Sequence, residues 1–206
     1  MKKFIIGRKI ESSQLFDAKG NVVPITTIVA GPCKILQIKT KASDGYESLQ
    51  LGFQAQETRK VKKTMKGKEF KVLKEFRQKG IPEELADGIK GLKEGDWFDV
   101  SIFNEGEKVN VSAIAKGKGY QGAVKRWGFH GKNATHGNRH DERTLGSVGP
   151  SYPQRVTKGR HMSGRMGGQR TTVKNLVVVK IDKDKNILAV RGAVPGRNGA
   201  IVEVRG

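Results

Sequence analysis

Residues 116–170 contain too little apolar bulk to fold as a compact domain of their own. Among these 55 residues, Ile, Leu and Val occur only as Val124, Leu145, Val148 and Val156. Twelve basic and two acidic residues give the segment a net charge of +10, which is half of the chain's +20. Such a composition cannot bury enough surface to offset its ordering entropy. We therefore expect an extended arm that is mobile in the free protein.

The arm nevertheless has the composition of a surface that binds nucleic acid. It contains twelve of the 27 glycines and all four histidines, and aromatic rings stand among its cations. Cations neutralise phosphates, rings stack on bases, and glycines let the backbone approach closely. The predicted contacts are Lys116, Lys118, Lys125, Arg126, Trp127, His130, Lys132, His136, Arg139, His140, Arg143, Tyr152, Arg155, Lys158, Arg160, His161, Arg165 and Arg170.

The charge of the whole chain points to a polyanionic partner. Forty basic residues stand against twenty acidic ones, and the pI is about 10.2. The longest apolar run is far shorter than a membrane-spanning helix, so nucleic acid is favoured over an anionic membrane. Arg8 and Lys9 interrupt the apolar start after three residues, which argues against a signal peptide. The single Cys33 excludes an internal disulfide, permits a reducing cytosol, and is expected to pack as a small strand residue.

Outside the arm, short apolar alternations separated by turn residues predict a mainly β fold. Asp44-Gly45 and residues 104–106 are turn signals of the kind that join neighbouring strands. Trp97 lies in one of these alternations, so we expect its side chain to pack within a β-barrel formed by these strands. The predicted strands are Val22–Ala30, Cys33–Lys39, 46–53, 97–103, Lys108–Ile114, 171–181, 187–190 and 200–204.

The end of the chain must complete a sheet that the beginning starts. Residues 171–206 are rich in Val, Ile and Leu but too few to form a core alone. We therefore expect residues 1–115 and 171–206 to form one small antiparallel β-barrel domain, with residues 116–170 inserted as the arm. Pro82, followed by acidic residues, predicts one short helix over residues 83–92.

A second basic run lies at residues 58–68. It is either a solvated loop or a second RNA contact, and the residue pattern alone leaves both readings open. The candidate contacts there are Arg59, Lys60, Lys62 and Lys63.

Two motifs in the arm resemble sites of other chemistry and fail on their surroundings. Gly117, Gly119 and Gly122 have the spacing of a dinucleotide fingerprint, but no sustained helical period and no βαβ unit follow. His136 and His140 have a metal-like spacing, but a zinc site needs four ligands and no cysteine lies nearby. We therefore expect no metal, no cofactor and no small-molecule substrate.

Catalysis by the arm is the rival hypothesis: a nucleic-acid-processing enzyme with a His/acid site. The acidic pair Asp141-Glu142 is the only acidic group in the segment. An enzyme needs its catalytic groups on rigid elements, whereas these lie on glycine-rich chain. We therefore predict no catalytic residue. Trp127 also has two readings: it stacks on RNA, or it packs at the arm's own base.

The residues around the arm's root form a spaced pattern of Phe103, Asn110, Ala113, Gly117-Lys118-Gly119, Gly122 and Arg126. This pattern resembles the signature of a known family, the bacterial large-subunit ribosomal protein L-three. One position departs from the family's signature, because Ala115 stands where Ser or Thr is usual. Further matches cover most of the chain, including Ala134-Thr135-His136-Gly137-Asn138, Gly146-Ser147-Val148-Gly149 and Gly192-Ala193-Val194-Pro195-Gly196.

This resemblance implies a translation-factor-like barrel and a cytoplasmic, ribosomal location. It also implies direct, early binding to 23S-type large-subunit rRNA, with other large-subunit proteins as neighbours, and an arm that reaches toward the peptidyl transferase centre. The arm's tip would then fall near residues 146–155. Gln154 lacks the Asn-Gln context in which some relatives carry a methylated Gln, so that modification is not expected here.

Overall fold

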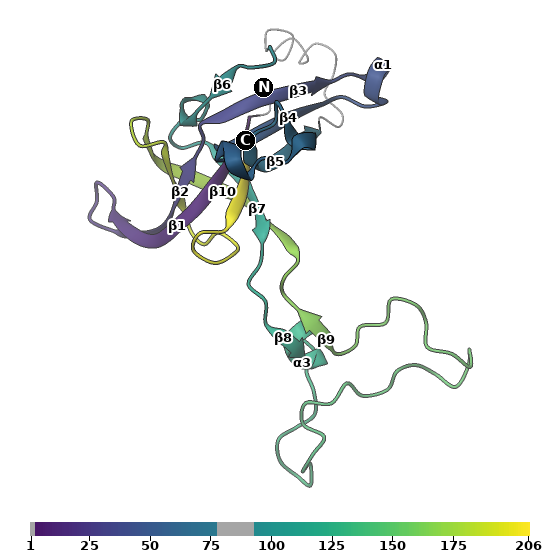
Figure 1. Cartoon of the computed structure of the whole chain (residues 1–206). Helices are drawn as coiled ribbons and strands as arrows, with labels where there is room; N and C mark the ends of the chain where they lie inside the picture. The colour runs from purple at the N-terminus through teal and green to yellow at the C-terminus, as the bar shows by residue number, and fades with distance from the viewer. Residues whose placement is uncertain (1–2, 78–92) are drawn as a thin grey trace. The chain divides into compact units, whose positions relative to one another are not determined.

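The chain divides into two compact units. The computed structural model describes residues 3–77 and 93–206 (Figure 1). One unit comprises Met1–Ile114 with Arg170–Gly206, and the other comprises Ala115–Gln169. The helix predicted over residues 83–92 lies outside the described residues.

The first unit is built around a closed antiparallel barrel of six strands in the order β1-β12-β7-β10-β11-β2 (Figure 1). Alternate side chains of these strands point inward. Val109, Val111, Val202 and Val204 are fully buried in this way, as expected for period-two patterning. The strands are β1 (Phe4–Phe16), β2 (Val22–Ala30), β7 (Lys108–Ile114), β10 (Arg170–Asp182), β11 (Ile187–Arg191) and β12 (Ile201–Arg205).

A second antiparallel sheet packs against the barrel in the same unit. Its strand order is β5-β4-β3-β6. Phe76 of this sheet stacks on Phe4 of β1, with ring centroids 4.8 Å apart, and both rings belong to one continuous core. The strands are β3 (Cys33–Lys39), β4 (Ser48–Ala55), β5 (Phe70–Arg77) and β6 (Trp97–Phe98).

The prediction of a mainly β, antiparallel fold is confirmed, and most of the predicted strands are present. A single barrel was expected, whereas the structure has a barrel and a companion sheet. The companion sheet forms because Cys33–Lys39 pairs with Ser48–Ala55, which in turn pairs with β5. Short helices occupy some of the connections. They are α1 (Lys41–Asp44), η1 (Thr58–Lys60), η2 (Lys63–Met65) and η4 (Val100–Ile102).

The strand predicted over residues 97–103 was wrong beyond Phe98. Asp99 accepts hydrogen bonds from the backbone N–H and the hydroxyl of Ser101, which begins a 3-10 turn in place of the strand. Packing of Trp97 inside the barrel was also wrong. Trp97 lies on the edge strand of the second sheet and is 56% exposed, with its ring tilted against Phe70.

Cys33 has the predicted role of a buried strand residue, and this makes its thiol a probe of unfolding. Its side chain is inaccessible to solvent, and burial raises the pKa of the thiol to about 12. Because the thiolate is the reactive form, we expect a thiol reagent at pH 8 to modify the native protein only as fast as it opens. The measurement is the labelling rate with and without denaturant. Fast labelling of the native protein would contradict the burial of Cys33.

Candidate nucleic-acid interface

The arm begins and ends on two neighbouring strands of the barrel. Ile114 of β7 is paired with Arg170 of β10. The segments that follow Ile114 and precede Arg170 continue alongside each other within the arm. Ala115 donates its backbone N–H to Gln169 at 2.9 Å, and Gly168 donates back to Ala115 at 3.1 Å. These main-chain hydrogen bonds hold the two segments of the arm's root together.

A glycine is required at a close approach between the two segments of the root. Gly167 has φ of +74°, and a Cβ atom there would lie 2.1 Å from the backbone oxygen of Lys116. Lys118 then donates its N–H to Met166 at 2.9 Å, where the short strands β8 (Gly119–Gln121) and β9 (Gly164–Met166) begin to pair. The glycine-rich sequence therefore permits a close two-stranded stem.

Next to this stem lies a five-residue helix, α3 (Ala123–Trp127), which ends at Gly128 in the left-handed conformation (Figure 1). Arg126 and Trp127 both donate hydrogen bonds to the backbone oxygen of Met162, at 2.8 and 2.9 Å. The indole of Trp127 stacks on His161 with centroids 3.8 Å apart and an interplanar angle of 1°. These contacts join the outgoing and returning chains of the arm.

Trp127 therefore packs at the arm's base, which is one of the two readings that its sequence allowed. One face of the indole is occupied by His161, yet the residue is still 42% exposed. Stacking of an RNA base on the remaining surface stays a prediction.

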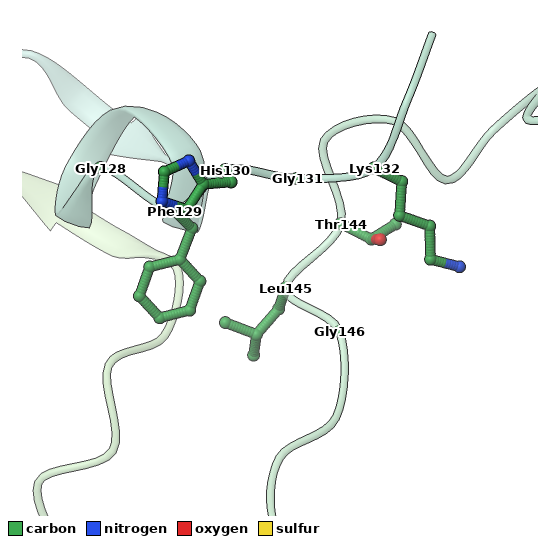
Figure 2. A pocket seen from close by; sticks show the side chains of 8 residues that line it. All are labelled: Gly128, Phe129, His130, Gly131, Lys132, Thr144, Leu145 and Gly146. Carbon is green, nitrogen blue, oxygen red and sulfur yellow. The ribbon is translucent and has the colours of Figure 1, made fainter. Parts of the chain in front are cut away.

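Beyond α3 the described arm is irregular chain with a shallow hollow, shown in Figure 2. Phe129 and Leu145 contribute its apolar side chains and point toward the same space, and His130 also lines the hollow (Figure 2). Gly131 passes so close to the backbone oxygen of Glu142 that a Cβ atom would clash at 2.3 Å. Lys132 donates its backbone N–H to the same oxygen at 2.9 Å. The hollow is thus held by a backbone contact that needs glycine.

Almost all of the predicted contact residues present their side chains to solvent. Arg126 is half-buried, and the other seventeen in the arm are exposed, with Tyr152 at 81%. In the described part of the chain, ion pairs engage only two of these cations: Lys132 with Asp141 at 2.8 Å, and Arg170 with Glu203 at 2.5 Å. Most of the arm's positive charge therefore faces solvent without a carboxylate partner among the described residues.

The histidines do not converge on a metal or catalytic site. No group of three or more His, Cys, Asp or Glu side chains that could hold a metal ion occurs among residues 3–77 and 93–206. Asp141, the acid nearest in sequence to His140, pairs with Lys132. The Gly117, Gly119 and Gly122 motif lies in the antiparallel stem and not in a βαβ unit. The same described ranges contain no helix long and apolar enough to cross a membrane.

In the second basic run, two of the four candidate cations share an acidic partner. Glu57 pairs with Lys60 at 2.9 Å and with Arg59 at 3.0 Å, and these hydrogen bonds lower the pKa of the Glu57 carboxyl. Lys62 and Lys63 are exposed: Lys62 caps the 3-10 turn η2, and Lys63 is its first residue. A role in RNA binding for this run remains a prediction.

One cationic cluster in the first unit was missed at the sequence level. Lys74, Arg170 and Arg205 surround the carboxylate of Glu203, at 3.4, 2.5 and 3.7 Å. Strand periodicity does place Glu203 and Arg205 on one face of β12. Lys74 and Arg170, however, reach that face from distant parts of the sequence, so only the fold brings them together.

Comparison with known proteins gives a consistent family assignment. The family model of ribosomal protein L3 matches residues 93–187. The large ribosomal subunit protein uL3 of Geobacter sulfurreducens is 42% identical over all of this chain and 97% of its own length. The uL3 proteins of Carboxydothermus hydrogenoformans and Dehalococcoides mccartyi are each 41% identical, covering 100% and 98% of this chain and 97% and 96% of their own lengths. The resemblance seen in the sequence is thereby confirmed: this chain belongs to the uL3 family of ribosomal proteins.

Proposed function

We propose that this chain is a structural constituent of the large ribosomal subunit in the cytoplasmic ribosome. In this proposal it binds 23S-type rRNA directly, supports early assembly, and contacts neighbouring large-subunit proteins. The relatives carry the name of large-subunit proteins. The observation that carries the RNA-binding role is the arm itself, which has a net charge of +10 and whose predicted contact residues are nearly all exposed.

The physical basis of the interaction is the release of counterions from the RNA. Each phosphate that a Lys or Arg neutralises frees condensed cations, which makes affinity fall with salt. The glycines of the arm let main-chain N–H groups reach phosphates as well. Exposed rings such as Tyr152 are available to stack on unpaired bases.

The rival enzymatic role has no specific observation in its favour. The family consists of ribosomal proteins and not enzymes, so the prediction that the chain is not an enzyme is confirmed by its relatives. Asp141, the acid next to His140 in the sequence, pairs instead with Lys132.

We also propose that the arm extends toward the peptidyl transferase centre, with its tip at residues 146–155. The family resemblance implies this placement, and the proposed tip presents Tyr152 and Arg155 to solvent. A segment with so few apolar side chains gains its order from its surroundings, and tightly packed rRNA supplies phosphates and bases on all sides.

The direct test of RNA binding is a footprint on isolated large-subunit rRNA, combined with a salt titration. We expect local protection of the rRNA and a log–log salt slope of roughly −0.7 for each phosphate contacted on single strands, or −0.9 on duplex. The control is an unrelated RNA of equal length, which should be bound more weakly and without a discrete footprint. A slope near zero would refute the electrostatic basis of the proposal.

A further inference from the structure

A cluster of three cations around one carboxylate lies in the first unit, outside the arm. Glu203 of β12 pairs with Arg170 of β10 at 2.5 Å, Lys74 of β5 at 3.4 Å and Arg205 of β12 at 3.7 Å. The four residues come from three strands, two of the barrel and one of the companion sheet. Their positions are therefore fixed by regular secondary structure.

The carboxylate lies beneath the cations. The side chain of Glu203 is 12% exposed, whereas those of Arg205, Lys74 and Arg170 are 38%, 46% and 47% exposed. Three positive charges against one negative charge leave the cluster at +2. The exposed side of the cluster is therefore cationic, with N–H donors that Glu203 does not use.

The orientation of Arg205 is restricted further by aromatic rings. Its guanidinium lies 5.5 Å from the ring centroids of both Phe4 and Phe76, which are stacked on each other. A planar guanidinium held in this way keeps its N–H groups in a fixed fork, the geometry that matches phosphate oxygens. Ligand groups held by a supporting carboxylate lose less entropy on binding than free surface side chains.

We propose that Lys74, Arg170 and Arg205 form a binding site for one phosphodiester group of the rRNA backbone, with Glu203 as the positioning residue. The inference rests on the proposed function, since the rRNA supplies the phosphate. Unlike the arm, this site is built on the barrel and its companion sheet and is formed before RNA binds. It adds Lys74 and Arg205 to the RNA-binding residues.

A purely structural role, tying β5 to β12, is the competing explanation for the cluster. A tie between these strands requires one cation on Glu203, and the pair with Lys74 already provides it. The convergence of two further arginines leaves three cations around a single carboxylate, and the repulsion between them is unfavourable without a second anion. The surplus charge therefore favours a ligand.

The test uses full-length protein with Lys74→Gln, compared with Lys19→Gln as a control of equal charge change. Lys19 lies in the exposed turn after β1, where residues 10–25 carry a net charge of −1. For Lys74→Gln we expect the salt slope of rRNA binding to become shallower by roughly 0.7–0.9. Phosphate-ethylation interference should also lose its signal at the phosphate contacted by the site. Lys19→Gln should match the wild type in both measurements.

Each outcome decides the proposal. If Lys74→Gln keeps the control's slope and every interference signal while its thermal unfolding temperature falls, the cluster only ties the strands together and the proposed site does not exist. If the wild type itself shows no salt-dependent rRNA binding, the proposed function fails, and this result is distinct from failure of the site. Loss of one local interference signal, with the arm's signals intact, supports the site.

Discussion

A variant without the arm is expected to keep a folded barrel and to lose at least ~10³-fold of its affinity for large-subunit rRNA at moderate salt. The change replaces Ala115–Gln169 with Asn-Gly, a dipeptide suited to a tight hairpin turn. Ile114 and Arg170 are already paired across β7 and β10, so a short turn can join them. The deletion removes eleven basic and two acidic residues and lowers the net charge from +20 to +11.

The barrel should survive because its core contains no residue of the arm. Every residue of the main hydrophobic cluster lies within Met1–Ile114 or Arg170–Gly206. The free energy of unfolding should therefore stay close to the wild-type value, as measured by denaturant titration with Cys33 labelling as a second probe. The weaker binding follows from the removal of cations that neutralise phosphates. The size of this electrostatic contribution is seen in its salt dependence, since a protein that neutralises six to ten phosphates loses about 10³–10⁵ in affinity between about 50 and 200 mM salt.

A second variant separates charge from shape. Replacing Lys116, Lys118, Lys125 and Lys158 with Gln keeps the length of the arm. It should make the salt slope of rRNA binding shallower by roughly 0.7 for each phosphate that is no longer neutralised.

If the arm-less variant bound rRNA as tightly as the wild type, the affinity would reside in the barrel and its companion sheet. If it failed to fold, the arm would contribute to the core in a way that its composition does not indicate.

The strand pattern of the barrel could largely be predicted because one face of each strand is buried. The alternation in Cys33–Lys39 and Lys108–Ile114 is of this kind. The first strand, β1, was not among the predicted strands, because Arg8 and Lys9 interrupt its apolar run after three residues. Lys9 is only 8% exposed and donates a hydrogen bond to the backbone oxygen of Val194 at 2.8 Å. Such a tertiary partner, 185 positions away in the chain, leaves no local signal in the sequence.

The candidate RNA-binding surface was predictable in composition and not in geometry. A scarcity of Ile, Leu and Val between two β-rich segments is a local property, and it located the arm. The stacking of Trp127 on His161 joins residues on opposite chains of the arm, and the cluster at Glu203 joins three strands. Both arrangements depend on which segments of the chain lie side by side, and only the fold determines that.

Replacing Trp127 with Ala should weaken rRNA binding without changing its salt dependence. The indole carries no charge, so its removal releases no counterions. The substitution removes the stack on His161 and the hydrogen bond to Met162, and it also removes a ring on which a base can stack. Removal of a base–aromatic stack typically costs ~1–3 kcal/mol, which is about 5- to 150-fold in affinity. Titrations at several salt concentrations measure both the affinity and the slope.

Trp127→Phe is the matched control, because it keeps an aromatic ring while it loses the N–H donor and part of the indole's stacking surface. Met162 still receives a hydrogen bond from Arg126 in that variant, so a smaller decrease in affinity is expected. A slope that became shallower for Trp127→Ala by as much as for an arm Lys→Gln variant would contradict an uncharged role. It would show instead that the indole holds cations, such as Arg126, against phosphates.

Tyr152→Ala at the proposed tip should behave differently from Trp127→Ala. Tyr152 is 81% exposed, and most of the arm's cations lie elsewhere in the sequence, so subunit yield should be nearly normal. If the tip lies near the peptidyl transferase centre, the variant should instead alter peptide-bond formation or the response to drugs that act there. The comparison scores subunit yield and peptidyl transfer separately in assembled subunits. Normal yield with unaltered peptidyl transfer and drug response would place the tip elsewhere, because a ring this exposed has no packing role in the protein to mask its loss.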